Sequence, residues 1–243
     1  MVIYGIYSDI HSNLEALQSV LKSMDKYNIQ EKICLGDAVG YGPYPNECIE
    51  LIQESSSAVL LGNHDSVALN RESAEQFNFF ARNAIEWTKR TLSSKSSDIM
   101  QKWSYLLDKS PLTFVHASPR SPADWTYIAT LDDAVDAFRY FSKKICFIGH
   151  THLPVIVVME GEQSFYVSEH YFHQVQDNQR VLVNVGSVGQ PRDGTPDASW
   201  CLCDSDTLEI KIIRVPYDFK KTQEAMKEKG LDEFLINRLA IGK

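Results

Sequence analysis

Residues that can bind metal ions recur directly after short apolar stretches of the chain. Five such stretches, at 2–7, 32–35, 58–61, 112–115 and 145–148, are followed in turn by Asp9 with His11, by Asp37, by Asn63 with His64, by His116, and by His150 with His152. Five of the seven histidines lie at these positions. Imidazole nitrogen combined with carboxylate and amide oxygen suits first-row divalent metals.

The number of these side chains indicates more than one ion. Leaving His64 aside, seven potential ligands remain, which is more than a single tetrahedral zinc requires. Two ions of higher coordination number, completed by water, account for all of them. We therefore expect two divalent transition-metal ions, with manganese favoured and Fe, Zn, Ni or Co as alternatives.

The apolar stretches are typical of buried strands, and helices are predicted between the first three. Ser12-Asn13-Leu14-Glu15 resembles a capping box that opens a helix running to about Tyr27. Pro45 is well placed as the first residue of a second helix, ending near Glu54. Strands alternating with helices predict a parallel sheet, in which the carboxyl ends of the strands converge on a ligand crevice. The sequence-distant metal ligands are therefore expected to meet in space.

The remainder of the chain predicts an α/β protein in one domain spanning 1–243. Helical periodicity from Ser73 to about Leu107 indicates two helices joined at 93–97, and this insertion at about 71–109 either packs as a helical pair or caps the site. Beyond a helix at about 132–141, residues 154–215 are expected to form consecutive strands, with a hairpin turn at 204–206. The polar tail from Lys220 is expected to be helical and peripheral.

The bulk composition excludes several functional classes. The net charge of −8 gives no general attraction to duplex nucleic acid or to an anionic membrane, so we expect neither as a partner and expect a small substrate instead. Five cysteines without framework spacing, and an opening segment without signal-peptide features, favour the cytoplasm. Cys201 and Cys203 share one side of a predicted strand, where packing as small hydrophobic residues is favoured over metal binding.

Taken in order, these strand-end clusters resemble the signature blocks of the calcineurin-like metallophosphoesterase superfamily across residues 9–152. The later segment Asn184-Val185-Gly186-Ser187-Val188-Gly189-Gln190-Pro191-Arg192-Asp193 is similar to one found in its small bacterial phosphodiesterase-type members, although Val185 stands where proline is more usual. The resemblance implies two packed mixed β-sheets flanked by helices, a four-layer α/β/β/α sandwich with a helical insertion. It also implies a metal-dependent phosphoric ester hydrolase that uses a metal-bridging hydroxide.

The same resemblance implies a role for each position. One ion would be held by Asp9, His11 and His152, a second by Asn63, His116 and His150, and Asp37 would bridge them. Asn63 would also contact substrate. His64 would be catalytic, either stabilising the transferring phosphoryl group or protonating the leaving oxygen. Arg120 and Arg192 are candidates for gripping a phosphate oxygen, since guanidinium groups match phosphate geometry. His170 and His173 are expected to lie at the surface or in packing contacts.

Several functions share such a site. A phosphodiesterase or nucleotide-directed phosphoesterase is the first hypothesis, and hydrolysis of dinucleoside polyphosphates stays open. A protein serine/threonine phosphatase is disfavoured, because those enzymes carry an Asp and an Arg shortly after the bridging Asp, where this chain reads Ala38-Val39-Gly40-Tyr41-Gly42. A non-catalytic scaffold, like one retromer subunit of similar fold, is disfavoured because every expected ligand position is filled. What orients His64 is not set by the sequence, with Asp65 one possibility.

Overall fold

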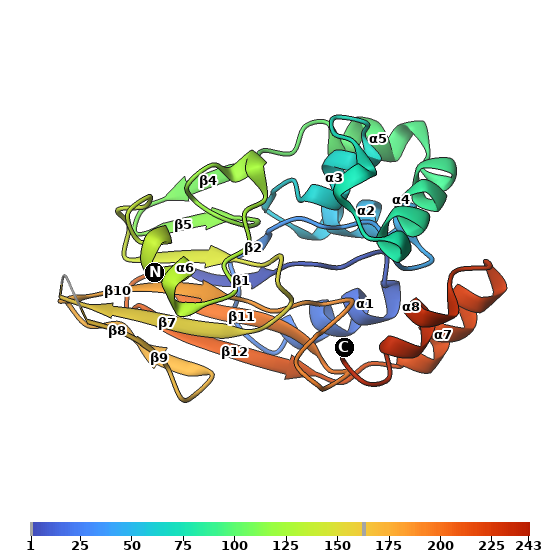
Figure 1. The fold of residues 1–243 in the computed structure, drawn as a ribbon. Coiled ribbons are helices and arrows are strands. Elements are labelled where there is room, and N and C mark those ends of the chain that lie inside the picture. Colours follow the sequence, from blue (N-terminus) through green and yellow to red (C-terminus); the bar gives the residue numbers. More distant parts are fainter. Residues whose placement is uncertain (1, 162–163) are drawn as a thin grey trace.

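Two six-stranded sheets form the centre of the computed structural model, which describes residues 2–161 and 164–243 (Figure 1). The first sheet runs, from edge to edge, β3 (Ala58–Val59), β2 (Glu31–Cys34), β1 (Ile3–Tyr7), β11 (Ala198–Asp204), β12 (Glu209–Val215) and β9 (Phe172–Gln174). The second runs β4 (Leu106–Lys109), β5 (Leu112–Val115), β6 (Ile145–Ile148), β10 (Gln179–Asn184), β7 (Val155–Glu160) and β8 (Ser164–Val167).

Both sheets are mixed, and their parallel parts hold the strands that precede the candidate ligands. Strands β1, β2 and β3 pair in parallel, as do β5, β6 and β10. Antiparallel pairing of β11 with β12 confirms the predicted hairpin through 204–206. The carboxyl ends of β1, β2, β3, β5 and β6 are therefore available to build one site, as the sequence predicted.

Apolar side chains from both sheets interlock in a shared core. Ile6, Ile33, Phe114 and Phe147 are fully buried there, together with Cys201 and Cys203. The two cysteines are free thiols that pack as hydrophobic residues, which confirms the expectation for them. Because the sheets pack face to face, the loops that follow their parallel strands are held at a fixed separation.

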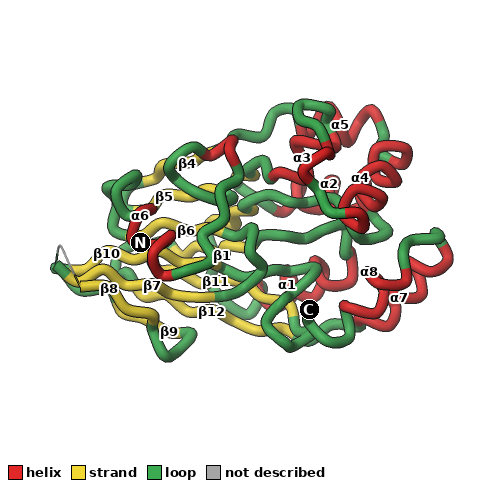
Figure 2. Tube along the Cα trace, in the orientation of Figure 1, coloured by secondary structure: helices red, strands yellow, loops and turns green. Residues whose placement is uncertain are grey.

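Helices flank the two sheets, giving the four-layer α/β/β/α sandwich. They are α1 (Leu14–Met24), α2 (Pro45–Ser55), α3 (Asn63–Ala68), α4 (Phe79–Thr91), α5 (Ser94–Met100), α6 (Leu131–Ala137), α7 (Phe219–Glu228) and α8 (Glu233–Arg238), with 3-10 turns at Ala74–Gln76 and Pro122–Asp124. In the view of Figure 2 most of the helices gather at one end of the sheets, and α6 lies apart from them. Side chains of α1 and α2 pack on the first sheet, and α6 packs on the second. Among the described residues, no helix is long and apolar enough to cross a membrane.

Three local predictions differ from the structure. The first helix begins one residue later than expected, because the Asn13 side chain accepts a hydrogen bond from the Ala16 backbone N–H and so caps it. Ser12 instead adopts a positive φ of 56°. The segment 94–97 is the first turn of α5 rather than a linker. Residues 106–109, predicted within the helical insertion, form strand β4, which pairs with β5 at the sheet edge.

Helix α4 packs against α2 and α3, and helix α5 packs against α2. Ile85 and Met100 are fully buried in the cluster formed with α1 and α2. Only the segment before α4 approaches the candidate ligands, since the Phe77 ring lies 4.6 Å from that of His64. Within the insertion, the loop therefore contributes to the site and the two helices support it.

The C-terminal tail is helical as predicted, but it is not peripheral. The Thr222 hydroxyl in α7 bonds to the Asn13 and Glu15 side chains at 3.0 and 3.1 Å. Leu235 in α8 packs in a buried cluster with Tyr41, from the loop after β2. The polar composition of this tail concealed a narrow apolar face that contacts loops next to the site.

Candidate metal centre

The predicted ligands come together at the carboxyl ends of the parallel strands. Their side chains form three overlapping groups, and within each group the potential ligand atoms all lie within 4.8 Å of one another. The groups are Asp9–His11–His152, His11–Asp37–His64 and Asp37–His116–His150. All of these residues are buried.

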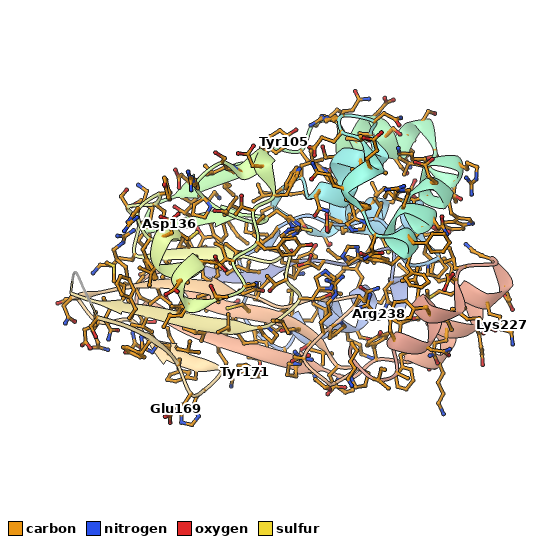
Figure 3. All side chains as sticks on the ribbon, in the orientation of Figure 1. Tyr105, Asp136, Glu169, Tyr171, Lys227 and Arg238 are labelled. Atoms are coloured by element: carbon orange, nitrogen blue, oxygen red, sulfur yellow. The ribbon has the colours of Figure 1, made fainter. Side chains whose placement is uncertain are left out.

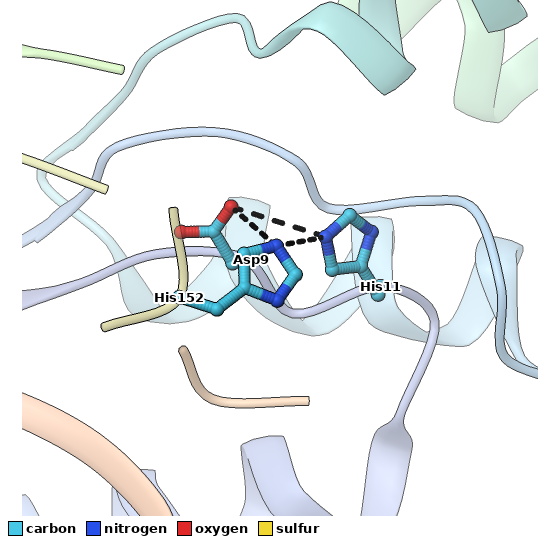
Figure 4. Close-up of side chains that lie close together, drawn as sticks. All are labelled: Asp9, His11 and His152. Atoms are coloured by element: carbon cyan, nitrogen blue, oxygen red, sulfur yellow. Dashed lines mark hydrogen bonds and ion pairs between the residues drawn. The ribbon is translucent and has the colours of Figure 1, made fainter. Parts of the chain in front are cut away.

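The first group joins the loop after β1 to the loop after β6 (Figure 4). The His152 Nε2 atom lies 3.3 Å from Asp9 Oδ1, and His11 Nε2 lies 3.9 Å from the same oxygen. The two imidazole Nε2 atoms are 3.1 Å apart. Three ligand atoms of a kind that binds divalent metals thus face one small space.

The remaining candidate ligands, Asn63, His116 and His150, lie on the other side of Asp37, and we call them the second group. The Asp37 Oδ2 atom lies 3.5 Å from His116 Nε2 and 3.7 Å from His11 Nε2, so this carboxylate reaches both groups. Asn63 Oδ1 lies 3.3 Å from His116 Nε2, which brings the amide into the second group. The division of these residues between two ions stays the prediction that the resemblance implied.

Backbone carbonyls fix the orientation of three histidine rings. The Nδ1 atoms of His11, His116 and His152 lie 3.0, 3.2 and 2.6 Å from the carbonyl oxygens of Val39, Leu35 and Gln190, respectively. A carbonyl only accepts, so the proton belongs on Nδ1 and the Nε2 lone pair faces the cluster. This outer hydrogen bond is the pattern that metal-binding histidines show.

Buried polar atoms at the centre have no hydrogen-bond partner among the described residues. Asp9 Oδ1 and His150 Nε2 are both in this state. Buried polar atoms are normally satisfied, so unpaired acceptors that converge on one space call for a ligand. The Nε2 lone pairs of His11 and His152, which face each other, also require a ligand. A pair of divalent cations would satisfy these atoms, and the residues present therefore fit the metals that the sequence predicted.

The charges of the cluster depend on burial and on the neighbouring groups. Burial raises the pKa of Asp9 and Asp37, but nearby histidines outweigh it and hold both carboxyl pKa values below the ordinary range. Burial lowers the pKa of His150 to about 3 and also lowers those of His11 and His152. His116 differs: burial lowers its pKa, but Asp37 and Asp9 together raise it to about 9. Without cations, His116 would carry a second proton, on Nε2, at pH 7.

The backbone at the ligands is strained. Asp9, His11, Asp37, His150 and His152 have φ values of 57°, 49°, 52°, 68° and 63°. Residues other than glycine adopt this left-handed backbone conformation at a cost of about 1–3 kcal/mol each, and such residues cluster at functional sites. The tight turns bring successive ligands onto one edge.

Two glycines allow the loops to approach the carboxylates. A Cβ atom at Gly62 would lie 2.1 Å from Asp37 Oδ1, and one at Gly149 would lie 2.5 Å from Asp9 Oδ2. Both distances are far below van der Waals contact. Glycine at these positions is required by the close packing around the ligands.

The segment after β10 braces the first group. The Ser187 hydroxyl and the Gly189 backbone N–H both donate to the Asp9 carbonyl, at 2.8 and 2.9 Å. Gln190 supplies the carbonyl that holds His152. Support of Asp9 and His152 from behind is thus the structural role of the 184–193 segment.

His64 is oriented by packing. Its ring lies between those of Tyr41 and Phe77, at 4.7 and 4.6 Å, and a Cβ atom at Gly40 would lie 2.4 Å from its Nδ1. Its backbone N–H donates to Asp37 Oδ1 at 2.9 Å. The suggestion that Asp65 orients the ring is wrong. That carboxylate instead accepts from the Val39 and Gly62 backbone N–H groups and joins the two loops.

The two candidate arginines lie in different surroundings. Arg192 donates to Gln190 Oε1 at 3.0 Å, and its cation lowers the pKa values of His152 and His64, which burial already lowers. Its Nε atom is buried without a partner among the described residues. Arg120 instead pairs with Asp136 at 3.6 Å and lies over the Tyr140 ring. Asp136 lies on the α6 side of the molecule, opposite Arg238 in α8 (Figure 3).

Sequence reasoning missed the aromatic residues at the entrance. The Tyr127 ring stacks on that of His150, with centroids 3.9 Å apart, and Phe77 packs on His64. Tyr127 comes from an irregular loop, where periodicity gives no signal. Phe77 was predicted within a helix that starts at Ser73, but α4 begins only at Phe79 and Phe77 lies in the segment before it. His170 is exposed, and His173 bonds to Gln179, so neither joins the cluster.

A comparison with known protein families identifies the superfamily of this chain. The family model described as a calcineurin-like phosphoesterase superfamily domain covers residues 1–208. The chain belongs to this superfamily. The resemblance in the sequence is thereby confirmed, and this phosphoesterase is a metal-dependent phosphoric ester hydrolase with Asp and His groups able to hold metal ions.

Similar proteins match the phosphoesterase along its whole length. An uncharacterized protein of Methanocaldococcus jannaschii is 38% identical over 243 residues, covering 98% of both chains. The crystal structure of a metallophosphoesterase from Sphaerobacter thermophilus is 36% identical with a TM-score of 0.87, covering 100% of this chain and 99% of that one. A hypothetical protein from Pyrococcus horikoshii, 21% identical with a TM-score of 0.80 and the same coverage, shares the fold.

Proposed function

We propose that this phosphoesterase hydrolyses phosphodiester or nucleotide-type substrates at a site that holds two divalent ions, with manganese favoured. The observation that carries the proposal is the position of Asp37, whose Oδ2 lies within 3.7 Å of His11 on one side and 3.5 Å from His116 on the other. When bound, the two ions would supply a hydroxide nucleophile at neutral pH and neutralise the charge on the phosphoryl oxygens.

The protein's own residues position the ligands and the substrate. Asp9, His11 and His152 would hold one ion, and His116, His150 and Asn63 the other, with Asp37 between them. The amide of Asn63 also lines the adjoining cavity, where it can meet a phosphate oxygen. Arg192 lies on the opposite side, beside His152, and is the better placed of the two arginines for holding a non-scissile oxygen.

His64 acts as a hydrogen-bond donor to the phosphoryl group. Burial lowers the pKa of His64 to about 4, so its imidazole is neutral at pH 7, and cations nearby would lower that pKa further. A neutral ring donates its N–H without giving up a proton. Of the two roles that the sequence left open, stabilisation of the transferring group is therefore favoured over general acid catalysis.

A direct test uses manganese-supplemented protein and the chromogenic diester bis(p-nitrophenyl) phosphate. Wild-type protein should release p-nitrophenol, and His64→Ala should lose about 100-fold or more of the turnover while keeping its metals. His170→Ala changes an exposed histidine outside the cluster and is the matched control. A panel of cyclic nucleotides, dinucleoside polyphosphates, diesters and monoesters would then identify the preferred class.

The same panel separates the enzyme from a scaffold. A protein that binds both ions but hydrolyses none of these esters would contradict catalysis and favour a protein-binding role.

A further inference from the structure

A cavity with aromatic walls opens beside the second group of ligands. It has a volume of about 660 Å³ and is lined by Asn63 and His150 at its inner end. Phe77, Trp125 and Tyr127 line it further out. The His150 Nε2 atom is buried without a hydrogen-bond partner among the described residues. The cavity is thus continuous with the centre where phosphate would bind.

Two of the aromatic rings lie directly against residues of the centre. Tyr127 stacks on His150 with an interplanar angle of 29°, yet it remains 54% exposed. Phe77 lies 4.6 Å from His64. A substrate whose phosphorus sits between the ligands and His64 must therefore pass one of its ester groups along these rings.

The cavity is preorganised by hydrogen bonds between two loops. The Trp125 indole N–H donates to both carboxylate oxygens of Glu72, at 2.9 and 2.8 Å. Glu72 also accepts from the Ser66 hydroxyl at 2.7 Å, and Ser66 lies in α3 with Asn63 and His64. The loop that carries Tyr127 is thereby tied to the helix that carries His64, so the walls are held before substrate arrives.

The charge of the cavity excludes a second phosphate. Glu72, Glu75 and Asp124 lie around it, and no lysine or arginine among the described residues lines it. Carboxylates repel an additional anionic group at short range. Planar uncharged rings, in contrast, stack favourably on aromatic side chains.

We propose that this cavity is a subsite for a nucleobase or a similar planar uncharged ring carried by one ester group of the substrate. The inference rests on the proposed function and adds where one ester group of the substrate lies. The ring extends past Tyr127 and Phe77, and the carboxylates around the cavity leave no place in it for a further phosphate. Tyr127 is then a specificity-determining residue.

The test compares two diesters that share one leaving group. Thymidine 5′-(p-nitrophenyl phosphate) carries a base, and methyl p-nitrophenyl phosphate does not. With manganese-loaded protein, Tyr127→Ala should lower the ratio of kcat/KM for the thymidine ester to kcat/KM for the methyl ester about tenfold, because one stacking contact to the base is lost. Tyr127→Phe keeps the ring and should retain the preference. Tyr140→Ala, which removes an exposed tyrosine beside Arg120, is the control.

Binding gives a second readout that is independent of turnover. In calorimetric titrations, Tyr127→Ala should raise the ratio of the Kd of thymidine 5′-monophosphate to the Kd of inorganic phosphate about tenfold relative to wild type. Hydrolysis of both diesters with no preference, and equal thymidine monophosphate binding by both proteins, would overturn the subsite while leaving the proposed function intact. Failure to hydrolyse either diester would overturn the proposed function, and the titrations would then decide the subsite alone.

Discussion

The two sides of Asp37 use similar ligands in different settings. On the Asp9 side, His11 and His152 are held by the carbonyls of Val39 and Gln190. Thr222 and Met226 of α7 line the small space beyond His11. On the other side, His150 and Asn63 open onto a cavity of about 660 Å³. One half of the centre is therefore an enclosed anchor, and the other half is shaped to receive the substrate.

The largest effect is expected from removing the residue that the two sides share. Asp37→Ala should lower turnover about 1,000-fold, because both ions lose a ligand and their spacing is no longer fixed. Metal content measured by plasma mass spectrometry should fall below two ions per chain. Asp136→Ala on α6 is the control. A variant that keeps both ions and wild-type turnover would show that Asp37 does not join the two sides.

A smaller loss is expected when His64 is displaced without being removed. Gly40→Ala would place a Cβ atom 2.4 Å from His64 Nδ1, so the ring has to move, and kcat should fall about 100-fold with both metals retained. Gly230→Ala is a matched control, because Gly230 also has a positive φ but a Cβ atom there would meet nothing within 4 Å. Equal activity of the two variants would refute the claim that packing orients His64.

The enclosed side should affect binding more than chemistry. Arg192→Gln should raise KM about tenfold with little change in kcat, because a charge-assisted contact to a phosphate oxygen is lost. Arg120→Gln should leave both parameters unchanged, since that guanidinium faces Asp136 and Tyr140. Steady-state kinetics on one diester decides between them. If Arg120→Gln raises KM and Arg192→Gln does not, the guanidinium that holds the phosphate oxygen is that of Arg120, on the α6 side.

The smallest effect is expected from the protonation of the histidines, which differs between the two sides of Asp37. His11 and His152 have lowered pKa values and are already neutral, whereas the pKa of His116 is raised to about 9. The raised pKa stabilises the metal-free fold below pH 6.5, and that stabilisation is lost as pH rises through about 9. Manganese uptake at pH 7.5 should therefore release about one proton, and affinity should rise toward pH 9. Calorimetry in two buffers of different ionisation enthalpy measures the proton release. Manganese binding without any proton release would contradict this assignment.

Sequence alone predicted that the candidate ligands meet at one edge of the sheets, but it did not predict the aromatic walls beside them. Asp9, His116 and His150 follow apolar strands, and the geometry of a parallel sheet forces such strand ends together. Tyr127 and Phe77 lie in loops whose course depends on contacts such as Trp125 with Glu72, and no local pattern encodes those contacts.

Long-range contacts also explain the other differences. Thr222 reaches Asn13 across 209 positions of sequence, so the packing of the tail had no local signal. Strand β4 is only four residues long and exists because it pairs with β5, although its sequence also fits a helical period. The cap at Asn13 rather than Ser12 follows from the positive φ that Ser12 adopts in the turn beside the centre.

Anomalous diffraction from crystals grown with manganese would test the two-ion centre without relying on turnover. Two peaks about 3.5–4 Å apart are expected, one beside Asp9, His11 and His152 and the other beside Asn63, His116 and His150, with Asp37 between them. A single peak, or a pair of peaks that Asp37 does not contact, would contradict this arrangement.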